Sequence, residues 1–163
     1  GSGGQQLGSI WGHGALVAPD WSADWLHRET LALLSQSSQR QFGQPFKSLS
    51  AGDQAKLTAE LQPKLRSNTY DPATGVLTVS EDRALAMQEV AAHYETVFSE
   101  DPAGAALRET YAMKDATVDT AEHRRQMSGF FFWTSWAAVT QRQWRATPPR
   151  PACSCGPCSA FCS

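Results

Sequence analysis

The sequence predicts a mainly α-helical fold with one small β-hairpin. Apolar residues recur every three or four positions in several segments, and Ser, Asp or Pro residues stand where those segments would begin as helices. One turn-rich segment also precedes a β-branched run. Hydrophobic residues make up 41% of the 163 residues and charged residues 18%, which is typical of one folded domain with its own core.

The first elements are expected near the N-terminus. Residues 9–20 are predicted to form a loop with a short strand. Asp20 or Ser22 can then cap a helix by accepting hydrogen bonds from free amides of its first turn. This helix is predicted to end near Ser37, and the polar residues 36–44 are predicted to form a loop. Its buried side carries leucines at helical spacing, namely Leu26, Leu33 and Leu34.

A second helix is predicted to begin at Ser50, which is followed by Asp53 in a capping-box pattern. Its apolar side repeats every fourth residue, at Leu57, Leu61 and Leu65. Pro63 lies inside this pattern and lacks a backbone N–H, so the helix is expected to kink or end near Gln62.

The hairpin and three further helices complete the prediction. Residues 68–79 combine an Asp-Pro-Ala-Thr-Gly turn with a β-branched run. Ser80 can cap a third helix, whose apolar face carries Met87, Val90, Tyr94, Val97 and Phe98. Pro102, after an aspartate, starts a fourth helix. Asp119 and Glu122 frame the start of a fifth, which carries the aromatic residues Phe130, Phe131, Phe132, Trp133 and Trp136.

Charge and hydropathy exclude several classes of protein. The formal net charge is -2, and no long block of either sign occurs, which argues against binding to nucleic acid or a polybasic attachment to membranes. The longest apolar stretch, residues 130–139, is much shorter than the roughly 20 residues that a membrane-spanning helix needs. No segment of the chain is therefore expected to span a membrane.

The cysteines lie together near the C-terminus, at Cys153, Cys155, Cys158 and Cys162. One interpretation is a thiolate site for zinc or an iron–sulfur cluster, and the other is an unstructured tail. No His follows the Cys-x-x-Cys pair, so the signal for covalent haem attachment is missing. The predicted organisation is a linker or cloning remnant over residues 1–4, a domain over residues 5–145 and a Pro/Cys-rich disordered tail over residues 146–163.

No catalytic residue can be assigned from the motifs. The four histidines, His13, His27, His93 and His123, are each interpreted as surface or structural residues, because none has a second ligand at metal-binding spacing. No Gly-x-Ser-x-Gly elbow and no glycine-rich phosphate loop occurs. Asp20, Asp24 and Glu29 share one predicted helix with His27 and Arg28, and a salt-bridged surface is the expected arrangement. No metal or cofactor site is therefore predicted.

The residues from Trp11 to Glu29 are unusually rich in aromatic and charged side chains. Trp11, Trp21 and Trp25 fall within fifteen positions, and buried indoles need a partner for their N–H group. The segment is either a cluster that caps the core or an interface with another domain.

Three blocks in this sequence resemble quinol-dependent nitric oxide reductases. They are residues 9–29 (SIWGHGALVAPDWSADWLHRE), 68–79 (NTYDPATGVLTV) and 131–138 (FFWTSWAA). The first resembles the signature after the first membrane helix of that family, and the other two follow it in the family's order. The resemblance covers roughly residues 5–141.

The resemblance implies a haem-free, cytochrome-c-like domain on the periplasmic face of a bacterial inner membrane. The parent reductase converts two nitric oxide molecules to nitrous oxide, with haem b and non-haem iron in a membrane part that this sequence lacks. The domain would hold no cofactor, would cap that membrane part and would catalyse nothing alone. The matching signature residues would be structural or would form an interface: Trp11, His13, Asp20, Trp21, Asp24, Trp25, His27, Arg28 and Glu29.

The sequence departs from the family pattern at Pro63 and over residues 144–163. A frameshifted or truncated coding sequence would account for the latter. Two alternatives stay open. One is a periplasmic binding module with a Cys-rich metal or thiol tail, and the other is an active haem protein.

Overall fold

The computed structural model of the protein describes residues 20–141. The predicted strand before Asp20, the linker 1–4 and the tail 146–163 lie outside the described residues, as do Trp11 and His13. Within residues 20–141 the predicted fold class, mainly α with one hairpin, is confirmed. No helix in this range is both long enough and apolar enough to cross a bilayer.

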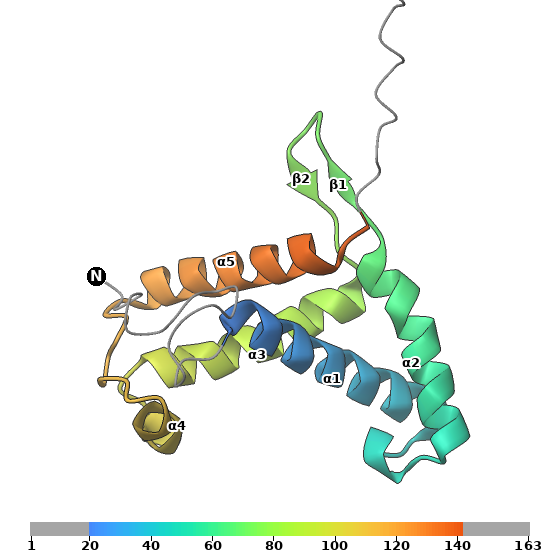
Figure 1. The fold of residues 1–163 in the computed structure, drawn as a ribbon, viewed down its shortest axis with the longest axis horizontal. Coiled ribbons are helices and arrows are strands. Elements are labelled where there is room, and N and C mark those ends of the chain that lie inside the picture. Colours follow the sequence, from blue (N-terminus) through green and yellow to red (C-terminus); the bar gives the residue numbers. More distant parts are fainter. Residues whose placement is uncertain (1–19, 142–163) are drawn as a thin grey trace, which may run out of the picture.

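Three long helices form the centre of the fold, and the remaining elements lie around them (Figure 1). The central helices are α1 (Trp21–Phe42), α3 (Glu81–Phe98) and α5 (Ala121–Val139). Helix α2 packs against α1, and the hairpin projects beyond the C-terminal end of α5 (Figure 1). These outer elements are η1 (Phe46–Ser48), α2 (Ala51–Arg66), β1 (Tyr70–Asp71), β2 (Val76–Leu77), η2 (Pro102–Gly104) and α4 (Ala105–Thr110).

The predicted helix starts are confirmed by their capping bonds. The Asp20 carboxylate accepts hydrogen bonds from the backbone N–H groups of Ser22 and Ala23, at 3.1 and 3.2 Å. The Ser50 and Ser80 hydroxyls accept from N–H groups in the first turns of α2 and α3. Thr120, between the two acidic residues that framed the prediction, caps α5. The fourth helix begins at Pro102 as a 3-10 turn and continues as α4.

The predicted end of the first helix is wrong. Helix α1 continues past Ser37 to Phe42 and ends at Gly43, whose φ of 65° is the left-handed conformation that glycine favours at this position. The expected polar loop over residues 36–44 is therefore largely helix. Ser38 explains this, because its side chain is buried and its hydroxyl donates to the Gln44 carbonyl.

Of the two outcomes expected at Pro63, a kink or an end of the helix near Gln62, the end is wrong. Helix α2 continues through Pro63 to Arg66. Pro63 is exposed, whereas Leu61 and Leu65 on either side of it are both buried. The burial of Leu65 therefore offsets the backbone hydrogen bond that the proline cannot donate.

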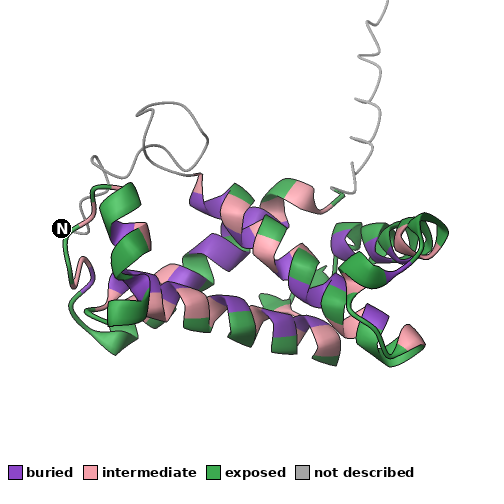
Figure 2. Ribbon diagram, turned by 90° about the horizontal axis from the view of Figure 1, so that it is seen from below, coloured by how far each residue is buried: buried purple, intermediate pink, exposed green. Residues whose placement is uncertain are grey.

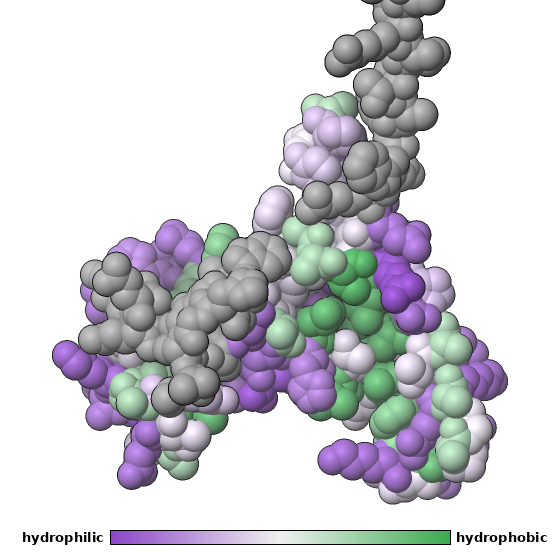
Figure 3. All heavy atoms as spheres, in the orientation of Figure 1, coloured by the Kyte–Doolittle hydropathy of each residue, from purple (hydrophilic) through white to green (hydrophobic). Residues whose placement is uncertain are grey.

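The core consists of two clusters of different chemistry. Helices α1, α3 and α5 enclose an aromatic cluster, whereas α1 and α2, with Ala86 of α3, enclose an aliphatic one. Figure 2 shows buried residues on the inward sides of the helices, and Figure 3 shows hydrophobic side chains gathered where α1, α2 and the start of α3 meet. The predicted faces of α2 and α3 are confirmed, because their apolar residues lie in these clusters.

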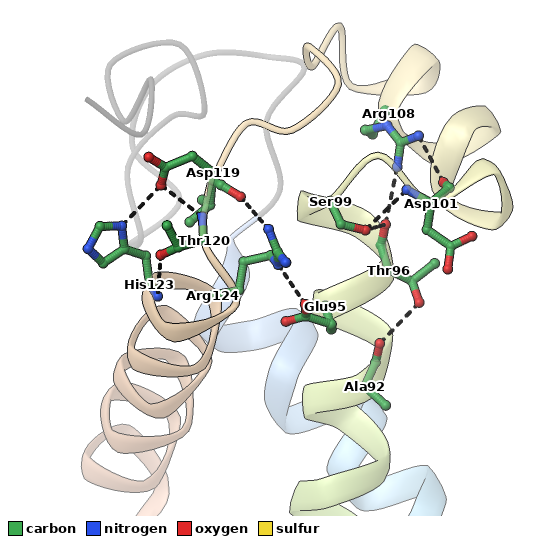
Figure 4. A network of polar contacts seen from close by, with 11 residues as sticks. Ala92, Glu95, Thr96, Ser99, Asp101, Arg108, Asp119, Thr120, His123 and Arg124 are labelled. Atoms are coloured by element: carbon green, nitrogen blue, oxygen red, sulfur yellow. Dashed lines mark hydrogen bonds and ion pairs between the residues drawn. The ribbon is translucent and has the colours of Figure 1, made fainter.

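Two arginines hold the connection between α3 and α5 (Figure 4). Arg108 is only 3% exposed and donates to the carbonyl oxygens of Thr96, at 3.1 Å, and Asp101, at 2.9 Å. Arg124 donates to the Val118 carbonyl and to Glu95, both at 2.7 Å. The connection is therefore fixed by polar contacts to backbone groups together with the burial of Val118 in the aromatic cluster.

Substitution of Gly104 by alanine is expected to destabilise the fold by about 1–3 kcal/mol through overpacking. A Cβ atom at this position would lie 2.5 Å from the Thr96 carbonyl oxygen and 2.5 Å from Nη1 of Arg108. Urea unfolding of Gly104→Ala measures the change.

Gly129→Ala is the matched control, because a Cβ there would have no atom within 4 Å. It is expected to stabilise α5 by up to about 1 kcal/mol, since alanine is the better helix former. Equal effects of the two substitutions would contradict the close packing of Gly104.

Candidate functional site: the signature residues of α1

Seven of the nine signature residues lie at the start of α1, and the other two, Trp11 and His13, lie outside the described residues. The helix period separates the seven into distinct roles. Trp21, Trp25 and Glu29 follow one another at four-residue spacing and are buried, whereas His27 is exposed. Three of the seven described signature residues therefore face the interior of the domain, and Asp20, Asp24 and Arg28 are half-buried.

The two tryptophans of α1 are central members of the aromatic cluster. The Trp25 ring stacks on Tyr94 of α3, with centroids 5.4 Å apart and planes inclined by 3°. Trp21 contacts Phe98 at 5.3 Å and Phe131 at 6.0 Å. The indole N–H groups of both tryptophans lack a hydrogen-bond partner among the described residues. The two tryptophans therefore stabilise the fold through ring packing rather than through polar contacts of their N–H groups.

Asp24 connects the signature to α3 through a small polar network. Its Oδ2 accepts a hydrogen bond from the Tyr94 hydroxyl at 2.8 Å and another from Nε of Arg28 at 2.8 Å. Asp24 and Arg28 thus form one of the salt bridges expected among the charged residues of this helix. Burial raises the pKa of the Tyr94 hydroxyl, and the negative charge of Asp24 raises it further. Tyr94 therefore donates to Asp24 as a neutral phenol.

The expectation that Glu29 belongs to a salt-bridged surface is wrong. Its side chain is 0% exposed and accepts a hydrogen bond from Nε of Arg83, on α3, at 2.6 Å. The Arg83 guanidinium lies over the ring of Phe132, on α5, at 5.4 Å from its centroid. Glu29 Oε2 and Arg83 Nη2 have no further partner among the described residues. The pair ties three helices together inside the domain.

Arg83 and Tyr94 were missed as partners of the signature. Arg83 lies three residues before Ala86 and seven before Val90, so it continues the apolar face of α3 towards the start of the helix. An arginine at such a position indicates a buried counter-charge on a neighbouring helix. The periodicity of α3 could thus have identified it.

The described histidines agree with their structural interpretation. His123 is exposed, with its Nδ1 3.1 Å from Asp119 of the same helix turn. His93 is half-buried against the Tyr94 ring, and burial lowers its pKa, with a smaller contribution from the charge of Arg28. Within residues 20–141 no three His, Cys, Asp or Glu side chains stand close enough to hold a metal ion.

Two surface grooves flank α3. One, of about 420 Å³, lies against α1 and includes Arg28, Glu89 and His93 in its lining. The other, of about 510 Å³, lies against α5 and is lined mainly by apolar and small side chains. The first groove also includes Ser35, but within residues 20–141 no hydrogen bond joins its hydroxyl to His93 or Glu89, and the structure assigns no catalytic role to these residues.

The comparison with protein families gives one match. The family of NorB cytochrome c-like domains, from nitric oxide reductase, matches residues 1–147, which include the signature and all described elements. The chain belongs to this family. The predicted family is thus confirmed at the level of nitric oxide reductase, and the helical architecture agrees with a cytochrome c-like domain. A comparison with curated proteins gave no match.

In this cytochrome c-like domain, removal of one partner of the Glu29–Arg83 pair is expected to cost about 3–5 kcal/mol, because a buried charge loses its counter-charge. Urea unfolding of Glu29→Ala and Arg83→Ala measures the loss. The double variant Glu29→Leu/Arg83→Met is expected to lie within about 2 kcal/mol of the wild type, since no buried charge remains. A double variant as unstable as the sum of the single ones would contradict this account.

The stability of the domain is expected to fall as the pH rises above about 10. In the folded state the pKa of Tyr94 is raised, so its proton is lost in the unfolded chain first. Tyr94 thus makes its full contribution to the free energy of unfolding at a pH below the pKa of tyrosine in the unfolded chain. Above that pH the contribution declines by up to about 1.4 kcal/mol per pH unit.

Urea unfolding of Tyr94→Phe at several pH values checks this, because the variant should have a much shallower slope. Tyr70→Phe, at an exposed tyrosine of the hairpin, is the control and should keep the wild-type slope. A wild-type slope in Tyr94→Phe would overturn the assignment.

Proposed function

We propose that this chain is the soluble domain of a quinol-dependent nitric oxide reductase and that it caps the outer, periplasmic face of the membrane part. The observation that carries the proposal is that signature residues of α1 make their contacts inside the domain. Trp21, Trp25 and Glu29 are buried in helix contacts, and Asp24 is engaged by Tyr94 and Arg28. These contacts favour a structural role for the signature residues over a catalytic one.

The same packing supports a domain without haem. The chain has no Cys-x-x-Cys-His motif, and residues 20–141 contain no cysteine. The interior between the three long helices is occupied by rings in mutual contact, among them Trp25 on Tyr94 and Tyr94 on Phe131 at 5.3 Å. These residues do not fit a covalently attached porphyrin, because they offer no cysteine to attach it and rings fill the space between the three long helices.

The proposed capping role explains why the signature residues contribute to the stability of the fold rather than to catalysis. A cap must keep its shape while electrons and protons move elsewhere in the enzyme. The reduction of nitric oxide, the haem b, the non-haem iron and the quinol site would all belong to the membrane part. The isolated chain is accordingly expected to reduce no nitric oxide and to show no haem absorption band.

The experiment compares two signature variants in the full-length reductase. Trp25→Ala removes a buried ring and is expected to cost about 3–5 kcal/mol, which should lower the amount of assembled reductase severalfold. Nitric oxide reduction per haem in the enzyme that does assemble should stay within about twofold of the wild type, because no reacting group is lost.

His27→Gln is the control, because His27 belongs to the same signature but is exposed. It should assemble and turn over like the wild type. A haem absorption band in the purified chain, or a loss of more than about tenfold in activity per haem for His27→Gln, would overturn the capping role.

A further inference from the structure

The C-terminal half of α5 presents an exposed face without any charged residue. From Ser128 to Gln141 the sequence contains no Asp, Glu, Lys, Arg or His. Phe130 is 50% exposed and Trp133 is 56% exposed, and they stand one turn apart on the same side of the helix. A surface helix normally carries polar residues on its outer side. This side of α5 is therefore built to contact something less polar than water.

The rings on this face continue into the hairpin. Trp133 lies 6.3 Å from Trp136, and Trp136 lies 6.3 Å from Tyr70 of β1, as measured between ring centroids. Tyr70 is itself 41% exposed. Trp136 itself is only 7% exposed and belongs to the aromatic cluster of the core, so it joins the exposed rings from beneath. We call the three exposed rings, Phe130, Trp133 and Tyr70, the aromatic face. Helix α5 lies at one edge of the described part, and the hairpin projects beyond its C-terminal end (Figure 1).

A cation without an ion pair among residues 20–141 lies near the hairpin end of this face. The Gln141 N–H donates to the Arg66 carbonyl at 2.9 Å, which holds the end of α2 beside the end of α5. Arg66 is exposed, and its guanidinium forms no ion pair with any residue of the range 20–141. A cation here can bind a phosphate group at the margin of an apolar surface.

We propose that the aromatic face rests in the headgroup layer of a lipid bilayer, with Arg66 directed to lipid phosphate. Trp and Tyr rings favour this layer because their apolar bodies and polar tips match its two environments. A helix that lies along an edge of a domain can lie parallel to a bilayer surface. The family supplies the setting, since its members are domains of a membrane enzyme.

A lipid surface fits this face better than a protein partner does. Protein interfaces usually surround an apolar centre with a polar rim of hydrogen-bonding and charged groups. Beyond Gln126 the exposed residues of α5 itself are Gly129, Phe130, Trp133 and Ala138, which provide no such rim. The inference rests on the proposed membrane location, but it can be tested apart from any reductase activity.

The test is flotation of the full chain with vesicles of phosphatidylcholine alone and of phosphatidylcholine mixed with anionic phosphatidylglycerol. The wild-type chain should bind both. The variant Phe130→Ser/Trp133→Ser should bind at least about tenfold more weakly, because two rings no longer enter the lipid. Arg66→Gln should lose about fivefold in affinity for the anionic vesicles and keep its affinity for phosphatidylcholine.

Leu31→Ser/Leu85→Ser is the matched control. These leucines are 45% and 50% exposed, but they lie on α1 and α3 away from the aromatic face. Leu85 also has Glu81 and Glu89 one turn before and after it. This variant should bind vesicles within about twofold of the wild type. Near-ultraviolet circular dichroism and thermal unfolding should confirm that every variant is folded.

Failure of the wild-type chain to bind either vesicle would overturn the inference, as would equal binding by Phe130→Ser/Trp133→Ser. If the same variant instead lowered the assembly of the full-length reductase without any vesicle binding, the aromatic face would contact protein and the lipid inference would be wrong. The proposed capping function would stand in that case, because it is read from assembly and from turnover per haem.

Discussion

The fold depends most on a single ion pair that is almost entirely buried. Glu29 lies on α1 between the tryptophans of the aromatic cluster and the leucines of the aliphatic one, and Arg83 precedes the buried face of α3. Two charges in an apolar interior are costly unless each satisfies the other. Because Arg83 also lies over Phe132, the pair contacts all three long helices, α1, α3 and α5. It thereby joins the two clusters.

The aromatic cluster adds rigidity on one side of this pair. Ring contacts join Trp21 and Trp25 to Tyr94 and Phe98 of α3 and to Phe131 and Phe132 of α5. Such interlocked rings pack closely and transmit strain. A cytochrome c-like architecture that has filled its own interior in this way is suited to hold a shape, which agrees with the scaffold role proposed for the domain.

The sequence predicts most of the helix starts, because a capping side chain and the amide that it serves are at most three residues apart. Asp20, Ser50 and Ser80 were identified for this reason. Helix ends were less predictable. The burial of Ser38 and Leu65 keeps α1 and α2 helical where local propensity favours a break, and that burial depends on contacts between helices. The buried position of Glu29 was missed for the same reason, since its partner lies 54 residues away.

The contacts of Arg108 and Arg124 between α3 and α5, which we call the arginine anchors, should tolerate acid. Guanidinium groups keep their proton throughout the range in which proteins are folded. Two of the three acceptors of Arg108 are main-chain carbonyl groups, as is one of the two acceptors of Arg124. Peptide oxygens do not titrate, so protonation of Asp115 and Glu95 would remove only part of each anchor. The segment between the two helices should therefore keep its conformation at a pH that neutralises surface carboxylates.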